Sequence, residues 1–195
     1  MTKLGLSKVP GLALGCAALV LCAISASAKD FNRNDGTTFH ANAGTTFILA
    51  PASTPGGPRS HAIDGVVLVS SLGDCTFHAT ANLVETASPT YFLITDGLFT
   101  ITTADGTSTL TASANGTLIV NPANGYMADI HYDVTFTGGT GRLKDAHGSA
   151  ELHGFVIFTT CDLVQPGGDS ICEGIVPAGA NTGKACWLLD GDLDY

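Results

Sequence analysis

Two histidines in the C-terminal half of the chain are the first candidates for a metal site. His131 and His153 lie in two stretches in which apolar and polar residues alternate, "ADIHYDVTF" and "SAELHGFVIF", and Asp129, Asp133 and Glu151 lie near them in sequence. If the two stretches pair as a hairpin, imidazole and carboxylate groups that can bind zinc would face one another. All five residues fall on the face opposite the apolar side chains, however, where exposure to solvent already explains them. We therefore predict no metal site and no cofactor.

Other catalytic patterns are missing from the sequence. It contains no G-x-S-x-G motif around a serine nucleophile and no signature of a reactive cysteine. The segment "DGDLD" (190–194) resembles the opening of a calcium-binding loop, but the glycine and the distant glutamate of such a loop are missing. The sequence therefore identifies no catalytic residue.

The first 28 residues have the composition of a secretory signal peptide. Lys3 and Lys8 give a positive start, an apolar run covers residues 11–24, and "ASA" (26–28) supplies small residues for cleavage before Lys29. The run is shorter than the roughly 20 residues of a membrane-spanning helix, and no later stretch is comparably apolar. We predict a secreted or periplasmic protein with no membrane span after cleavage.

The predicted mature chain, residues 29–195, is strongly acidic. Cleavage removes two of the eight basic residues and none of the seventeen acidic ones, which leaves a formal charge of −11. Such a charge argues against nucleic acid or an anionic membrane surface as the partner. The length is that of one domain large enough to bury its own core.

Four cysteines remain after the predicted cleavage, namely Cys75, Cys161, Cys172 and Cys186. An even number in an exported protein indicates two disulfides, because the compartment is oxidising. Three pairings are possible. We favour Cys75–Cys161 with Cys172–Cys186, because the second bridge would close a segment rich in glycine and proline. A zinc site is less well supported, since there is no C-x-x-C pair.

The middle of the chain alternates between short β-type segments and turn dipeptides. Thr, Ile, Leu and Val dominate segments such as "LFTITTA" and "TLIVNPA", which is typical of strands. Four dipeptides that favour tight hairpin turns follow one another at spacings of 9, 10 and 9 residues: Asp96-Gly97, Asp105-Gly106, Asn115-Gly116 and Asn124-Gly125. Two loops are expected at 51–60 and 165–184. We predict an all-β fold, a single antiparallel β-barrel of about eight strands, with a β-sandwich as the alternative.

A glycine-rich segment, "GGTGRLKDAHGSA" (138–150), could either bind a phosphate or reverse the chain. A phosphate-binding loop needs further glycines and a helix after it, whereas here Lys144 stands where the third glycine of G-x-G-x-x-G belongs. The residues that follow alternate as a strand does. We therefore interpret Gly138, Gly139, Thr140, Gly141, Arg142 and Gly148 as a structural turn. Arg142 would hold it by bonding to nearby carbonyls or to Asp145, or would alternatively meet a substrate carboxylate.

The same segment resembles the G-G-T-G-R-F-x-x-A-x-G pattern of the allene oxide cyclase-like barrel proteins, which include dirigent proteins. Leu143 replaces the usual aromatic residue, and the close match covers about 13 residues. The resemblance implies an eight-stranded barrel with a largely apolar interior that binds a small apolar molecule without a cofactor. The similarity lies in the turn and not in the barrel interior, so no catalytic residue is carried over from that family.

Two functions from different classes fit these expectations. The first is an exported barrel that binds a small hydrophobic ligand or serves as a structural or interaction module. The second is a cofactor-independent isomerase or cyclase, or dirigent-like steering of a lipid-like or phenolic substrate, which the resemblance alone implies. An interior filled with side chains would exclude an internal ligand site, whereas an open cavity with convergent polar groups would favour chemistry. The ligand and the oligomeric state do not follow from the sequence.

Overall fold

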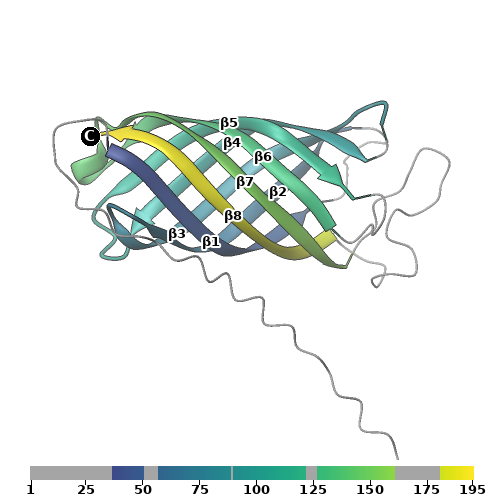
Figure 1. Ribbon diagram of the computed structural model, residues 1–195, viewed down its shortest axis with the longest axis horizontal. Coiled ribbons are helices and arrows are strands. Elements are labelled where there is room, and N and C mark those ends of the chain that lie inside the picture. The colour runs from purple at the N-terminus through teal and green to yellow at the C-terminus, as the bar shows by residue number, and fades with distance from the viewer. Residues whose placement is uncertain (1–36, 51–56, 89, 122–126, 161–180) are drawn as a thin grey trace, which may run out of the picture.

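A computed structural model describes residues 37–50, 57–88, 90–121, 127–160 and 181–195. Within these ranges eight antiparallel strands form one closed barrel, in which each strand pairs with its neighbours in sequence and the last pairs with the first (Figure 1). The strands are β1 (Thr37–Leu49), β2 (Arg59–Val69), β3 (Gly73–Glu85), β4 (Tyr91–Thr103), β5 (Thr109–Val120), β6 (Met127–Gly139), β7 (His147–Thr160) and β8 (Asn181–Asp194). The predicted eight-stranded antiparallel barrel is confirmed, and the sandwich alternative is wrong.

The strands alternate between the interior and the outer wall. In β6 the buried positions include Ile130, Tyr132, Val134 and Phe136, and the residues between them face outward. β7 continues the pattern, with Leu152 and Val156 buried. Because successive side chains of a strand point to opposite faces, one wall of the sheet becomes the core and the other meets solvent. No helix in the described ranges is long and apolar enough to cross a membrane.

The dipeptide Asp96-Gly97 does not form the predicted hairpin turn. Both residues lie inside β4, where the pairing with β5 shifts between Ile94 and Gly97. Asp96 has a φ of 55°, in the left-handed region that Asp tolerates better than most residues. Ile94 and Phe99 both face the interior although they are five positions apart, an offset that would place them on opposite faces of a regular strand. The dipeptide therefore forms a β-bulge, whose extra residue keeps the apolar side chains inside.

Asn115-Gly116 is a second predicted turn that lies within a strand, here β5. Gly116 pairs with Tyr132 of β6, and a Cβ added at Gly116 would lie 1.9 Å from the carbonyl oxygen of His131. Glycine is thus needed because two strands approach closely. Of the other two dipeptides, Asp105-Gly106 does connect β4 to β5, and Asn124-Gly125 lies outside the described residues. The strands are consequently longer than the spacing of the dipeptides predicts.

The glycine-rich segment connects β6 to β7 through a short 3-10 helix, η1 (Gly141–Leu143). Gly141 has a φ of 59°, which favours glycine. Gly139 has no positive φ, but a Cβ there would lie 1.8 Å from the carbonyl oxygen of Thr109. The backbone nitrogen of Thr140 donates to that same oxygen at 2.9 Å. The segment therefore reverses the chain while packing against the start of β5.

Strands extend into the C-terminal ends of both predicted loops. β2 already begins at Arg59, inside the loop predicted for 51–60, and β8 begins at Asn181, inside the loop predicted for 165–184. Residues 51–56 and 161–180 lie outside the described residues. Continuous pairing of β1 with β8, from Thr37 with Leu193 to Leu49 with Asn181, closes the barrel and explains the early start of β8.

Candidate functional site

Aromatic and aliphatic side chains fill the interior of the described barrel. Seven rings touch in series, with centroid distances of 4.6 to 6.3 Å between neighbours: Phe158, Phe47, His61, Tyr132, Phe99, Phe77 and Trp187. Buried leucine, isoleucine, valine and alanine side chains surround them. An eight-stranded barrel is narrow enough to be filled by its own side chains or to hold one small ligand. In this barrel the rings occupy that space.

His61 and Tyr132 form a polar pair within this core. The Nε2 atom of His61 lies 2.7 Å from the hydroxyl of Tyr132, and both side chains are buried. Burial lowers the pKa of His61 from 6.5 to about 4, and burial also raises the pKa of Tyr132. Both groups are therefore neutral at physiological pH. The Nδ1 atom of His61 is buried without a hydrogen-bond partner among the described residues.

A second buried polar group lies near the other end of the ring series. The indole nitrogen of Trp187 donates to the hydroxyl of Thr45 at 3.3 Å, and that hydroxyl donates to the carbonyl of Ala185 at 3.3 Å. The side-chain donors of these two residues are thus satisfied, as buried polar groups usually are. His61 differs from them, because one of its two ring nitrogens has no partner in the part of the chain that the structure describes.

The glycine-rich segment does not bring catalytic groups together among the described residues. Its backbone contacts Ser108, whose hydroxyl accepts a bond from the Arg142 backbone nitrogen at 3.2 Å. Asp145 lies 3.7 Å from the Lys144 amine, so the ion pair expected between Asp145 and Arg142 is replaced by one with Lys144. The Arg142 side chain is exposed. Gly138 lies near the end of β6 and Gly148 near the start of β7. The backbone nitrogen of Thr140 donates to the carbonyl of Thr109.

The hairpin beside this segment is held by Asp105. Hydrogen bonds from the Thr103 hydroxyl, at 2.6 Å, and from the backbone and hydroxyl of Thr107 lower the pKa of Asp105 to about 2. The Arg142 guanidinium adds a smaller contribution in the same direction. Because every group that bonds to Asp105 lies within two residues of it, the carboxylate stabilises a local turn.

The four cysteines are only partly described. Cys75 is buried near the η1 end of the barrel, and it has no disulfide among the described residues; burial raises the pKa of its thiol. Thr160, the residue before Cys161, ends β7 at the opposite end of the barrel. Cys186 lies on β8, whereas Cys161 and Cys172 lie outside the described residues. The pairing of the cysteines stays a prediction.

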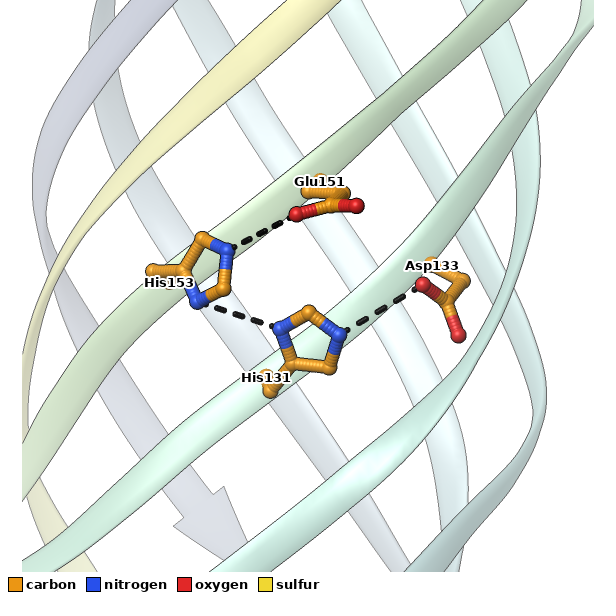
Figure 2. A network of polar contacts seen from close by, with 4 residues as sticks. All are labelled: His131, Asp133, Glu151 and His153. Carbon is orange, nitrogen blue, oxygen red and sulfur yellow. Dashed lines mark hydrogen bonds and ion pairs between the residues drawn. The ribbon is translucent and has the colours of Figure 1, made fainter.

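The outer wall brings together the residues that the hairpin argument singled out. His131 of β6 and His153 of β7 are direct cross-strand partners, and so are Asp133 and Glu151 (Figure 2). The two Nδ1 atoms lie 3.1 Å apart, and the ring centroids are 4.4 Å apart. The Nε2 atom of His153 lies 3.1 Å from Glu151, and the Nε2 atom of His131 lies 3.4 Å from Asp133. We call these four residues the outer histidine cluster.

The outer histidine cluster lies between two shallow hollows of the wall. One has a volume of about 280 Å³ and is lined by His131, His153 and Asp129 among others. The other has a volume of about 490 Å³ and is lined by Glu151, Asp190 and other residues of β6, β7 and β8. The His131 side chain is 36% exposed and that of His153 is 59% exposed. Both rings are therefore accessible to a solute.

Carboxylates form a row across this face. Asp133, Glu151 and Asp190 follow one another in register on β6, β7 and β8, and His40 of β1 bonds to Asp190 at the end of the row. Like charges placed directly opposite on neighbouring strands repel one another. Each of these carboxylates contacts a nearby imidazole. In the described part of the chain, no group of three or more histidine, cysteine, aspartate or glutamate side chains is arranged to hold a metal ion.

The sequence predicts that the residues of the outer histidine cluster face one another, but it does not predict the His61–Tyr132 pair. The signal was available in the alternation of β2, because His61, Ile63, Val67 and Val69 all occupy positions of the same parity. Tyr132 likewise shares the parity of Ile130 and Val134 in its strand. Which inward side chains touch across the barrel depends on register and strand tilt, so the contact itself does not follow from the pattern.

Comparison of the chain with protein-family models, with curated proteins and with solved structures finds no match.

Proposed function

We propose that this protein is an exported β-barrel without catalytic activity, which acts through its outer wall as a structural or interaction module. The ring series in the interior carries this proposal, because Phe99 and its neighbours occupy the space in which a small hydrophobic ligand would bind. The leader-like residues 1–28 support export. The acidic composition supports a partner other than nucleic acid.

Binding of small apolar molecules tests the proposal. Binding can be monitored through the NMR signals of core methyl groups. We expect the wild-type protein to show no saturable binding of benzene or of a medium-chain fatty acid. Phe99→Ala serves as the positive control, because removing this ring leaves an apolar cavity of the kind that takes up benzene. Saturable binding to the wild type, with shifts at residues around Tyr132, would contradict the proposal.

A cofactor-independent isomerase or cyclase acting inside the barrel is the second candidate. The His61–Tyr132 pair favours it, since a buried imidazole and hydroxyl can hydrogen-bond to a substrate, and the Nδ1 atom has no partner among the described residues. This function requires the surrounding rings to move aside for a substrate. Binding of a phenolic or lipid-like compound to the wild type, abolished in His61→Phe but retained in His78→Gln on the outer wall, would favour this candidate over the first.

A further inference from the structure

We propose that His131 and His153 bind one divalent transition-metal ion, such as Zn²⁺, between their two Nδ1 atoms. Zinc binding at this pair does not depend on whether the outer wall also contacts another macromolecule. It departs from the expectation drawn from the sequence, in which exposure alone explained these residues.

The number of protons in the outer histidine cluster carries this proposal. The Nε2 atom of each ring faces a carboxylate, Glu151 for His153 and Asp133 for His131, and each of these contacts is favourable when the nitrogen carries a proton. The contact between the two Nδ1 atoms requires a third proton. Two neutral imidazoles carry only two protons.

A neutral pair therefore leaves one repulsive contact. If both Nε2 atoms are protonated toward their carboxylates, two nitrogen lone pairs face each other at 3.1 Å. If the proton lies between the Nδ1 atoms instead, one Nε2 lone pair faces a carboxylate. A cation between the Nδ1 atoms removes the conflict, because each nitrogen then uses its lone pair as a ligand.

The separation of the two nitrogens suits a metal ion. Zinc binds imidazole nitrogen at about 2.0–2.1 Å, so two nitrogens on one tetrahedral ion lie about 3.3–3.4 Å apart. The observed 3.1 Å requires only a small adjustment of two partly exposed rings. Because strand pairing places the two residues directly opposite each other, the backbone already provides the spacing.

The surroundings of the pair also favour a cation. A carboxylate that bonds to the outer nitrogen of a ligating histidine fixes the tautomer and strengthens the ligand, and here each ring has such a carboxylate. Asp129 lines the same hollow as both rings and adds negative charge. With two protein nitrogens as ligands, water completes the coordination of the ion. Imidazole selects zinc, copper or nickel over calcium and magnesium, which prefer oxygen.

Isothermal titration of the purified protein with ZnCl₂ tests this site. We expect one Zn²⁺ ion per chain, no displacement by excess CaCl₂, and changes confined to the imidazole NMR signals of His131 and His153. His131→Gln and His153→Gln should each abolish this binding. Glu151→Gln should weaken it by about tenfold, because the carboxylate orients the ligand without touching the ion.

His78→Gln is the matched control. His78 is similarly exposed and bonds to Asp64 at 2.5 Å, but it has no second histidine beside it among the described residues. This variant should bind Zn²⁺ as the wild type does. Equal binding by the wild type and His131→Gln would place the ion elsewhere, for example on the cysteines, and would overturn the proposal. Absence of any heat and of any imidazole shift at saturating ZnCl₂ would overturn it as well.

Discussion

Two side-chain pairs that contain histidine differ in character, one inside the barrel and one on its outer wall. His61 pairs with Tyr132 in a closed apolar core, where burial keeps the imidazole neutral. His131 pairs with His153 on an accessible surface, where a carboxylate lies beside each ring. The difference shows that the strand face, rather than the residue type, decides whether an imidazole packs in the core or stays accessible to solutes.

The largest expected effect comes from breaking the inner region. Phe99→Ala removes a ring that touches both Phe77 and Tyr132, each at a centroid distance of 5.3 Å. We expect the free energy of unfolding to fall by about 3–5 kcal/mol, because the core loses apolar contact and retains a cavity. Denaturant unfolding followed by tryptophan fluorescence measures this change. A loss below about 1 kcal/mol, the usual range for surface substitutions, would show that the ring is not part of a packed core.

The inner pair should also make stability depend on pH. The pKa of His61 is lowered from 6.5 to about 4, so the unfolded chain binds a proton between these values while the folded chain does not. Stability should therefore be lost as pH falls from 6.5 to about 4, by about 3 kcal/mol in total. Unfolding of the wild type and of His61→Leu across this range provides the measurement.

On acidification, the free energy of unfolding of the wild type should fall relative to that of His61→Leu by about 3 kcal/mol. Asp105 does not interfere with this measurement. Its ionised carboxylate stabilises the fold, and that contribution is lost only as pH falls below the ordinary value of 3.8 toward the lowered pKa of about 2. Parallel pH curves for the wild type and His61→Leu would contradict the neutral, buried state of His61.

Removing the hydroxyl of the inner pair should have a smaller effect. Tyr132→Phe keeps the ring but leaves the Nε2 atom of His61 buried without its partner. We expect a loss of about 1–3 kcal/mol in the free energy of unfolding, which is the cost of an unsatisfied buried polar group. Tyr91→Phe, at a partly exposed position of β4, is the control and should change stability by less than about 0.5 kcal/mol. Equal effects of the two substitutions would show that the inner hydrogen bond contributes little.

The outer pair should contribute least to stability. The Asp133 and Glu151 side chains are 77% and 65% exposed, so solvent screens their contacts with the imidazoles. Asp133→Asn and Glu151→Gln should each change the free energy of unfolding by less than about 1 kcal/mol. Thermal unfolding at low and high salt measures this. A loss as large as that of Phe99→Ala would contradict the assignment of this face to binding rather than to folding.

Much of the architecture could be predicted because it depends on local pattern. Period-two alternation in "ADIHYDVTF" identifies both the inner and the outer residues of β6. The turn dipeptides were less informative, because Asp-Gly and Asn-Gly favour positive φ and small size without specifying a hairpin. At Asp96 that preference produces a bulge, and at Gly116 the missing side chain permits close strand approach. Only the barrel geometry separates these outcomes.

Of the two candidate sites, one follows from local sequence pattern and the other depends on the geometry of the closed barrel. The outer histidine cluster could be predicted because His131 and His153 belong to consecutive strands joined by one reversal, and their facing positions follow from a simple hairpin. The inner pair joins β2 to β6, which are not neighbours in the sheet. Their contact depends on the diameter and tilt of the closed barrel, so the residues could be assigned to the core but not to each other.

The central claim is that the inner imidazole is closed off from water, and an NMR titration of the six histidines tests it most directly. We predict that the ring of His61 keeps the nitrogen shifts of a neutral imidazole as pH falls from 7 to 5, and becomes charged only near pH 4. Substitution at position 61 assigns the signal. A His61 ring that titrates near the ordinary value of 6.5 would show that the interior is open to water and would contradict the closed core.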